Sequence, residues 1–327
     1  MKKFFKIVGY MFGGILLLLV AGFIYFNAKF PDVSKPQNIK VQITPERIKR
    51  GEYLVKHVAG CIDCHSERDW TIYGAPVVEG TEGKGGEKFG REVGFPGDIY
   101  AKNITPAGIG KWTDGELIRT ITQGVNKDNK ALFPLMPYNG FNSLTREDLY
   151  SIVSYIRSLK PLNNTVPETE LNFPLNFLIK TMPLKSYSPA PEIDRNDQVK
   201  YGKYLVTLAS CTDCHTQAEK GTPLPGMYLA GGMEFTLPWG TVRSANITPD
   251  EESGIGKWTK DQFIERFKAF DNDSMKTIKV GPKDFNTIMP WLFLSGMTEE
   301  DLGAIYEYLR TIQPVKNNVV HFTPVKD

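Results

Sequence analysis

Two stretches of sequence decide the fold of this chain: CIDCH at residues 61–65 and CTDCH at residues 211–215. Together they contain every cysteine of the 327-residue sequence. Each follows a related run, GEYLV at residues 51–55 and GKYLV at residues 202–206. The pairing of two different motifs at nearly the same offset indicates that one unit occurs twice.

Further landmarks recur downstream in the same order. All matched pairs are separated by 143 to 153 residues, as tandem duplication followed by changes in loop length predicts. The pairs are NITP at 103–106 and 246–249, GIGKWT at 108–113 and 254–259, and Met-Pro at 136–137 and 289–290.

Helix signals dominate each copy. Capping boxes predict helices that begin at Thr113 with Glu116 and at Thr259 with Gln262. The last helix of each copy is expected to begin at Thr145 or Thr298, because an i, i+3, i+4, i+7 apolar stripe follows. That stripe consists of Leu149, Ile152, Val153 and Ile156 in the first copy and of Leu302, Ile305, Tyr306 and Leu309 in the second.

Strand signals are scarce, and 30 glycines and 22 prolines indicate long loops, so the predicted fold class is mainly α with long loops. The first domain is expected at residues 40–160 and the second at 198–314. Residues 161–197 are rich in proline and predict an extended linker, and residues 315–327 form a polar tail.

The N-terminal segment, residues 1–30, predicts a membrane anchor. Residues 7–26 carry no charge, and a helix of that length covers about 30 Å of hydrocarbon. Lys2, Lys3 and Lys6 precede the span, so the positive-inside rule places the remaining chain outside the cytoplasm. The alternative is a cleaved signal peptide. Its apolar region would ordinarily be shorter, and only Ala28 offers a small residue near a cleavage site.

Composition excludes two classes of protein. The chain is 41% hydrophobic and 23% charged, within the range of globular proteins and outside that of disordered ones. Its 39 Lys and Arg residues nearly balance 37 Asp and Glu residues, so no basic surface for nucleic acid is expected.

The Cys-x-x-Cys-His spacing has a chemical reason. Two thiols at a helix start can add to both vinyl groups of one porphyrin, and the following imidazole can then bind the iron. A disulfide, a thioredoxin-like pair and half of a zinc site are alternatives, but none of them requires the histidine. The motifs therefore predict two covalently bound haem c groups, with the iron ligands His65 and His215 and the attachment residues Cys61, Cys64, Cys211 and Cys214.

The sixth iron ligand is predicted from the repeat. Between the two cysteine motifs only Met136 and Met182 offer a thioether, and Met182 lies in the Pro-rich segment. In the second copy only Met289 shares the Met-Pro context, although Met227, Met233, Met275 and Met297 also occur. Met136 and Met289 are thus the predicted ligands. The alternative is that both pack in the core, which is the ordinary role of a methionine at such a position.

A bis-histidine site would instead need His57 or His321. His57 lies eight residues before His65 on the same expected helix, about two turns from the porphyrin face. We therefore expect His57 to be a partly exposed structural residue.

These motifs together resemble a di-haem cytochrome c built from two class I domains, similar to the cytochrome c subunits of membrane-bound alcohol and gluconate dehydrogenases. The resemblance covers residues 45–313. It implies that four residues border the haem edges or propionates, although turn-forming and core roles explain the same residues. The four are Asn103, Trp112, Asn246 and Trp258. The dehydrogenase subunits carry three haems and a C-terminal anchor, whereas this chain has two haem motifs and an expected N-terminal anchor. This difference weighs against docking to such a dehydrogenase.

The expected function is a membrane-anchored electron carrier on the periplasmic side of the bacterial inner membrane. Its donor would be a dehydrogenase or quinol-oxidising complex, and its acceptor a terminal oxidase or soluble cytochrome. The sequence contains no catalytic set of the nucleotide-loop or Ser/His/Asp type. The alternatives are a di-haem peroxidase-like enzyme, which would lack a sixth ligand on one haem, and an electron-transfer subunit of a membrane dehydrogenase complex.

Overall fold

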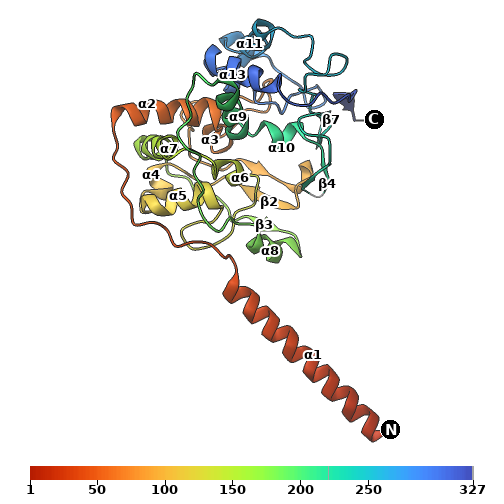
Figure 1. The fold of residues 1–327 in the computed structure, drawn as a ribbon. Helices are drawn as coiled ribbons and strands as arrows, with labels where there is room; N and C mark the ends of the chain where they lie inside the picture. The colour runs from red at the N-terminus through yellow and green to blue at the C-terminus, as the bar shows by residue number, and fades with distance from the viewer. Residues whose placement is uncertain (220, 326–327) are drawn as a thin grey trace.

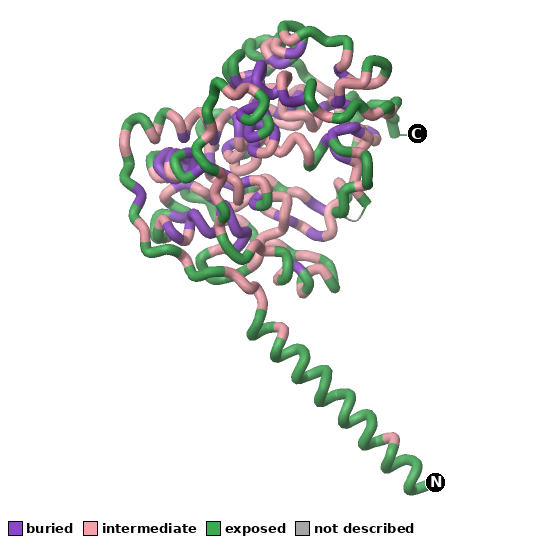
Figure 2. The backbone as a smooth tube through the Cα atoms, viewed as in Figure 1, coloured by how far each residue is buried: buried purple, intermediate pink, exposed green. Residues whose placement is uncertain are grey.

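The computed structural model describes residues 1–219 and 221–325. Helix α1 (Lys2–Lys29) projects from a body that holds the rest of the chain (Figure 1). None of its residues is buried, and Figure 2 shows it exposed along its length. By length and composition α1 can cross a membrane, and a signal sequence at this place in a chain meets the same criteria.

The body is mostly helical, as predicted. The helical elements of the first copy are α2 (Pro45–Tyr53), η1 (Leu54–Val58), α3 (Cys61–Cys64), η2 (Arg91–Val93), α4 (Pro106–Ile109), α5 (Asp114–Gln123), α6 (Tyr138–Phe141) and α7 (Arg146–Ser158). Those of the second copy are α9 (Gln198–Leu208), α10 (Cys211–His215), α11 (Lys260–Lys268), η4 (Asp273–Thr277), α12 (Trp291–Leu294) and α13 (Glu299–Leu309).

The predicted helix starts are confirmed. Thr113 and Thr259 cap α5 and α11 with complete capping boxes, and Thr145 and Thr298 cap α7 and α13. The apolar stripes of α7 and α13 lie in the core, except that Tyr306 is only partly buried.

Short strands form three small antiparallel sheets that the sequence did not predict. Each strand has two to four residues, too few to establish a period-two pattern. The sheets are β1 (Lys88–Phe89), β2 (Gly97–Tyr100) and β3 (Glu170–Leu171); β4 (Ala218–Glu219) and β5 (Thr222–Pro223); and β6 (Glu234–Leu237), β7 (Gly240–Arg243) and β8 (Phe322–Pro324).

The expected linker and tail are not simply extended. The segment 161–197 contributes β3, which pairs with β2 at Gly97 and Asp98, and it also contains α8 (Leu175–Leu178) and η3 (Ile179–Thr181). The tail contributes β8, which pairs with β7. Each segment therefore packs back onto the copy that precedes it.

The Gly-x-Tyr-Leu motif has a packing explanation. Helix α2 crosses α7 at Gly51, and α9 crosses α13 at Gly202. A β-carbon on Gly51 would collide with the carbonyl oxygen of Ser151, and one on Gly202 with that of Ala304. Glycine is required at both positions because the two helix backbones touch there.

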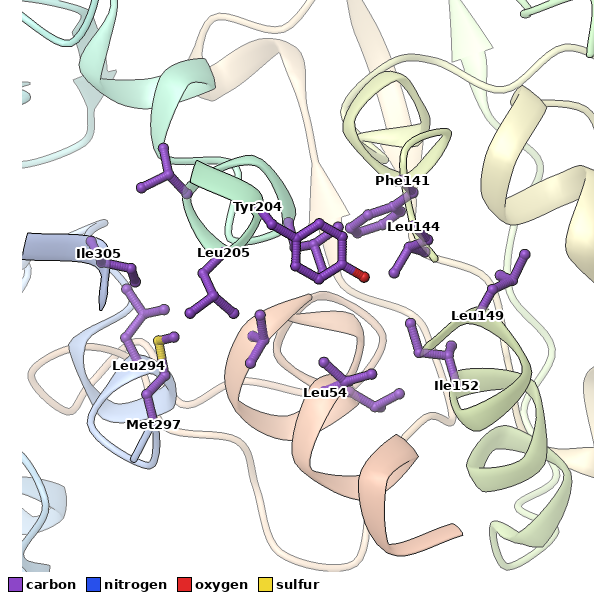
Figure 3. Packing of buried hydrophobic residues seen from close by; sticks show 14 of the residues in the cluster. Leu54, Phe141, Leu144, Leu149, Ile152, Tyr204, Leu205, Leu294, Met297 and Ile305 are labelled. Carbon is purple, nitrogen blue, oxygen red and sulfur yellow. The ribbon is translucent and has the colours of Figure 1, made fainter. Parts of the chain in front are cut away.

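One apolar core runs through both copies. Figure 3 shows Leu54 and Ile152 of the first copy in the same apolar region as Leu205 and Met297 of the second. Each of these side chains is at least 99% buried. Because these residues belong to one cluster, the two copies stabilise each other by apolar burial.

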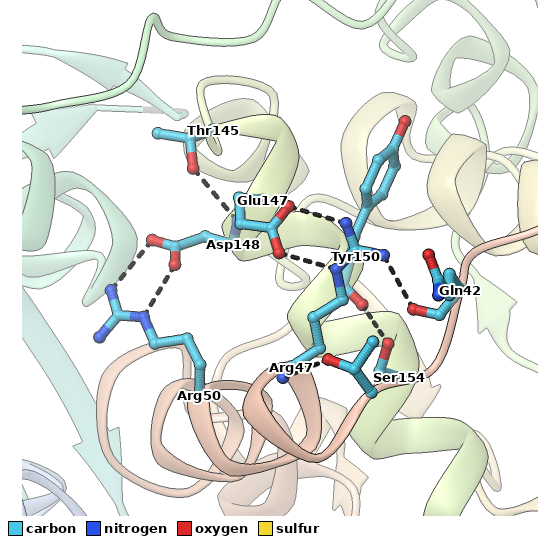
Figure 4. Close-up of polar contacts among 9 residues, drawn as sticks. Gln42, Arg47, Arg50, Thr145, Glu147, Asp148, Tyr150 and Ser154 are labelled. Carbon is cyan, nitrogen blue, oxygen red and sulfur yellow. Dashed lines mark hydrogen bonds and ion pairs between the residues drawn. The ribbon is translucent and has the colours of Figure 1, made fainter.

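Polar contacts reinforce the crossing of α2 and α7 (Figure 4). Arg50 donates to both carboxylate oxygens of Asp148 at 2.8 and 3.0 Å, and Arg47 donates to Glu147 at 2.7 and 2.9 Å. The Arg50 pair is largely buried and bidentate, the geometry in which such a pair is strongest.

The tyrosine of each Gly-x-Tyr-Leu motif reaches into the other copy. The Tyr204 hydroxyl donates to Asp148 at 2.8 Å and accepts from the backbone N–H of Thr145. The Tyr53 hydroxyl likewise donates to Asp301 at 2.6 Å and accepts from the N–H of Thr298. Each tyrosine thus binds the start of the other copy's last helix.

Removal of one of these hydroxyl groups should lower the free energy of unfolding of the protein. In Tyr204→Phe, the buried Asp148 loses one donor and the Thr145 N–H loses its acceptor, at an expected cost of about 1–3 kcal/mol. Guanidinium unfolding followed by circular dichroism measures the shift, and Tyr53→Phe should cost a similar amount. Tyr100→Phe is the control, because the structure shows no hydrogen bond from that hydroxyl to the described residues. An unchanged midpoint in both test variants would show that these bonds do not join the copies.

Candidate functional site

Both cysteine motifs begin a short helix after a sharp turn. Helix α3 follows Gly60 at φ +66°, and α10 follows Ser210 at φ +54°. The left-handed residue ends the preceding helix and redirects the chain, so the two cysteines of each motif start a new helical turn. A non-glycine residue in this conformation is uncommon, which makes Ser210 a locally strained position.

No disulfide joins Cys61, Cys64, Cys211 and Cys214. The protein atoms around them raise the pKa of Cys61, Cys64 and Cys211 to about 12, and that of the more exposed Cys214 to about 11. A thioredoxin-like pair needs a lowered thiol pKa. The surroundings of these thiols therefore argue against a dithiol redox site.

Each motif histidine is oriented by a backbone carbonyl. His65 Nδ1 lies 2.6 Å from the oxygen of Lys102, and His215 Nδ1 lies 2.7 Å from that of Ala245. A carbonyl only accepts, so Nδ1 carries the proton and Nε2 keeps a free lone pair. Burial also lowers the pKa of both histidines, which favours the neutral ring that iron ligation requires.

Two glycines support these histidines, and sequence reasoning missed both. The N–H of Gly85 donates to the His65 carbonyl at 2.8 Å, and the N–H of Gly231 donates to the His215 carbonyl at 2.7 Å. Their φ angles are +70° and +72°, and a β-carbon would press on the backbone of Lys102 or Ala245. The Gly-Gly pairs at 85–86 and 231–232 recur within the repeat offset and were the available signal.

Asn103 and Asn246 follow the two orienting carbonyls directly. Asn103 accepts from Thr105 through Oδ1 and donates to the Leu162 carbonyl at 2.7 Å. Asn246 makes the matching bonds to Thr248 and to the Val315 carbonyl. Both side chains are buried and hold the loop in place, and a direct contact with haem remains a prediction.

The two tryptophans differ in exposure. Trp112 is partly buried and packs against the core, and its carbonyl accepts from Arg157. Trp258 is 36% exposed, and its carbonyl accepts from the Tyr306 hydroxyl. Their placement at haem edges likewise remains a prediction.

The two Met-Pro turns have the same conformation. Pro137 lies at φ −79°, ψ 52° and Pro290 at φ −80°, ψ 61°. The residue after each proline donates its N–H to the methionine carbonyl, at 2.7 Å for Met136 and 2.8 Å for Met289. Both methionines are partly buried against the core, whereas Met297 is a fully buried core residue and Met182 is 41% exposed. The match supports equivalent roles for Met136 and Met289.

A buried donor next to the first Met-Pro turn fits a bound group. The Tyr138 hydroxyl is inaccessible and makes no hydrogen bond to the described residues, and burial raises the pKa of Tyr138 to about 12. Across the described residues, no cluster of His, Cys, Asp and Glu side chains could hold a metal ion by itself. The donor set predicted for each copy, two thiols, an imidazole and a thioether, is the set that haem c uses.

His57 lies in a π-helical turn and contacts the second copy. The first copy has one more residue than the second between its Gly-x-Tyr-Leu motif and its first cysteine, and η1 absorbs it as a π-helical turn. His57 Nδ1 lies 3.1 Å from the Phe293 carbonyl of the second copy, against Gly296. The expected structural role agrees with this contact.

Comparison with known proteins finds relatives among cytochromes c. The chain is 31% identical to the fructose dehydrogenase cytochrome subunit of Gluconobacter japonicus over 81% of this chain and 52% of the relative. It is 26% identical to a diheme cytochrome c-type protein of Cereibacter sphaeroides over 93% of this chain and 98% of the relative. The chain is homologous to cytochrome c subunits of membrane-bound dehydrogenases and to a diheme cytochrome c.

This homology implies covalent haem c, and the two Cys-x-x-Cys-His motifs are consistent with two haems. The gluconate 2-dehydrogenase cytochrome c subunit of Pantoea cypripedii is 27% identical over 91% of this chain and 64% of that subunit. The chain thus spans about half to two thirds of the length of the dehydrogenase subunits. No family model matches the chain.

Substitution of Gly85 tests whether its close approach to the Lys102 backbone matters for the position of His65. In Gly85→Ala, the methyl group should push on the Lys102 backbone and loosen the imidazole, at a cost of about 1–3 kcal/mol beyond the strain of a positive φ. Gly80→Ala is the matched control, because Gly80 has φ +79° and open space around its β-carbon. Denaturant unfolding measures the stability of both variants, and intact mass measures their haem attachment. Equal losses in the two variants would show that the close approach at Gly85 is unimportant.

Proposed function

We propose that this chain is a di-haem c-type cytochrome that carries single electrons on the periplasmic side of the bacterial inner membrane, anchored by α1. The observation that supports the proposal is that the same arrangement of residues around the motif histidine occurs in both copies. In both copies a backbone carbonyl orients the motif histidine, a glycine supports it, and a Met-Pro turn of the same conformation presents a thioether.

In each copy, the cysteines and the histidine of the motif have different roles in binding the cofactor. Cys61 and Cys64 would attach one haem and Cys211 and Cys214 the other. His65 and His215 would ligate through Nε2, since Nδ1 is occupied by the carbonyl bond. Bound haem c supplies a one-electron ferric/ferrous couple.

Met136 and Met289 would complete the axial ligation. A thioether raises the potential and fills the position at which a peroxidase would bind peroxide. Because the Met-Pro turns match, neither copy shows the asymmetry expected of a di-haem peroxidase-like enzyme. The carrier is therefore favoured over that enzyme.

The proposed redox partners follow from the relatives. Several are cytochrome c subunits of fructose, alcohol and gluconate dehydrogenases, so a membrane dehydrogenase is the proposed electron donor, and a subunit role in such a complex is the second candidate. The diheme relative from Cereibacter sphaeroides matches along nearly its whole length, which supports a two-haem carrier. A terminal oxidase or soluble cytochrome is the proposed acceptor.

Substitution of the thioethers tests this function. Met136→Ala and Met289→Ala should each remove about half of the weak far-red Met-to-iron absorption and lower the potential of one haem. Visible spectroscopy and a redox titration measure both effects. Met182→Ala, at a 41% exposed position, should change neither.

Peroxide reduction separates the carrier from the enzyme. It should be absent in the unmodified protein and appear only where a thioether is lost. Catalytic peroxide turnover by the unmodified protein, or a Met variant with unaltered spectrum and potential, would overturn the assignment at that haem.

A further inference from the structure

An apolar group of side chains lies exposed in the segment between the two copies. Phe173 is 84% exposed, more than any other large apolar residue between Phe30 and Val325 that the structure describes. Leu178 and Met182, within the next nine residues, are 45% and 41% exposed. Phe173 precedes α8, Leu178 is the last residue of α8, and Met182 follows η3. None of the three belongs to the buried apolar cluster.

This segment lies against the end of α1 (Figure 1). The Phe177 ring stacks on Phe26 with centroids 4.0 Å apart and on Phe23 with centroids 5.8 Å apart. Lys180 Nζ donates to Asn27 Oδ1 at 2.6 Å. Three side-chain contacts therefore fix the level of α8 along the axis of α1.

With α1 as the proposed membrane span, that level would correspond to the edge of the bilayer. The uncharged run of residues 7–26 covers about 30 Å, the thickness of the hydrocarbon core, so Phe26 would lie at its outer boundary. Phe23 would lie about one turn deeper. A ring stacked on both residues sits in the interfacial zone, where aromatic side chains are favoured.

We propose that residues 173–182 form a second membrane contact, in which Phe173, Leu178 and Met182 enter the headgroup and acyl boundary of the bilayer beside α1. The occupant of this apolar surface is lipid because the surface is continuous with the proposed span. The contact rests on the proposed retention of α1 as an anchor.

Two lysines near residues 173–182 are placed as expected for the membrane interface. The Lys180 ammonium nitrogen lies 5.9 Å from the centre of the Phe177 ring and donates to Asn27 Oδ1. Lys29 pairs with Asp32 at 3.1 Å just beyond the span. Lysines at this depth extend toward the headgroups while their stems remain in apolar surroundings.

A second contact would fix the orientation of the body. One flexible tether lets a domain tilt freely, whereas two contacts on one edge hold that edge against the bilayer. The opposite edge, which carries α11 and α13 in Figure 1, would then face away from the membrane. The contact thereby restricts the faces on which redox partners can dock.

Spin labels on the full-length holoprotein in phosphatidylglycerol/phosphatidylethanolamine nanodiscs test the contact. All native cysteines lie in the haem motifs, so Phe173→Cys and Leu178→Cys each introduce a single free thiol. The ratio of collision rates with oxygen and with a water-soluble nickel chelate reports depth. Val320→Cys, 67% exposed and close to β8, serves as the aqueous control, and Leu18→Cys as the mid-span control. The unsubstituted protein should take up no label.

We expect ratios at 173 and 178 several-fold above that at 320 and below that at 18. Labels at 173 and 178 that match the label at 320, with 18 deep in the bilayer, would overturn the contact and leave the anchor intact. A label at 18 that is aqueous, or a chain that lacks residue 18, would overturn the anchor and the contact together. A high ratio at only one of the two positions would also contradict insertion of the whole segment.

Discussion

Each motif histidine donates its Nδ1–H to a backbone carbonyl, and much of the surrounding structure serves to place that carbonyl. Lys102 and Ala245 supply the two oxygens. The following asparagine ties the loop to the chain beyond the last helix of its copy, and a glycine with positive φ closes the loop onto the histidine. The bond fixes the tautomer and the ring, and it leaves Nε2 free to act as the proposed iron ligand.

The second constraint is that the two copies are joined by side-chain contacts. Each Gly-x-Tyr-Leu motif provides a glycine for a helix crossing within its own copy and a tyrosine for the last helix of the other. The contacts are not fully symmetric, because the one-residue insertion at η1 places His57 against the Phe293 carbonyl. Tyr138 in the first copy also corresponds to Trp291 in the second, which lies under Arg266 at 4.8 Å. These different surroundings would let two haems bound in similar sites have different potentials.

Local signals in the sequence predicted local structure well. The capping threonines, the apolar stripes and the two cysteine motifs each depend on residues within one or two turns, and the structure confirms the helices that they predict. What the sequence left out depends on distant contacts. The reach of Tyr53 to Asp301, the support of His65 by Gly85 and the pairing of β8 with β7 each join segments whose proximity no periodicity reveals. The stacking of Phe177 on α1 belongs to the same class.

The central claim is that the chain holds two covalently bound haems, one in each copy. A pyridine haemochrome assay on membrane-extracted protein measures this most directly when combined with protein concentration. The account predicts two haem c groups per chain, one in Cys61→Ala/Cys64→Ala and one in Cys211→Ala/Cys214→Ala. Bound zinc, no covalent porphyrin, or a double variant that still carries both haems would contradict it.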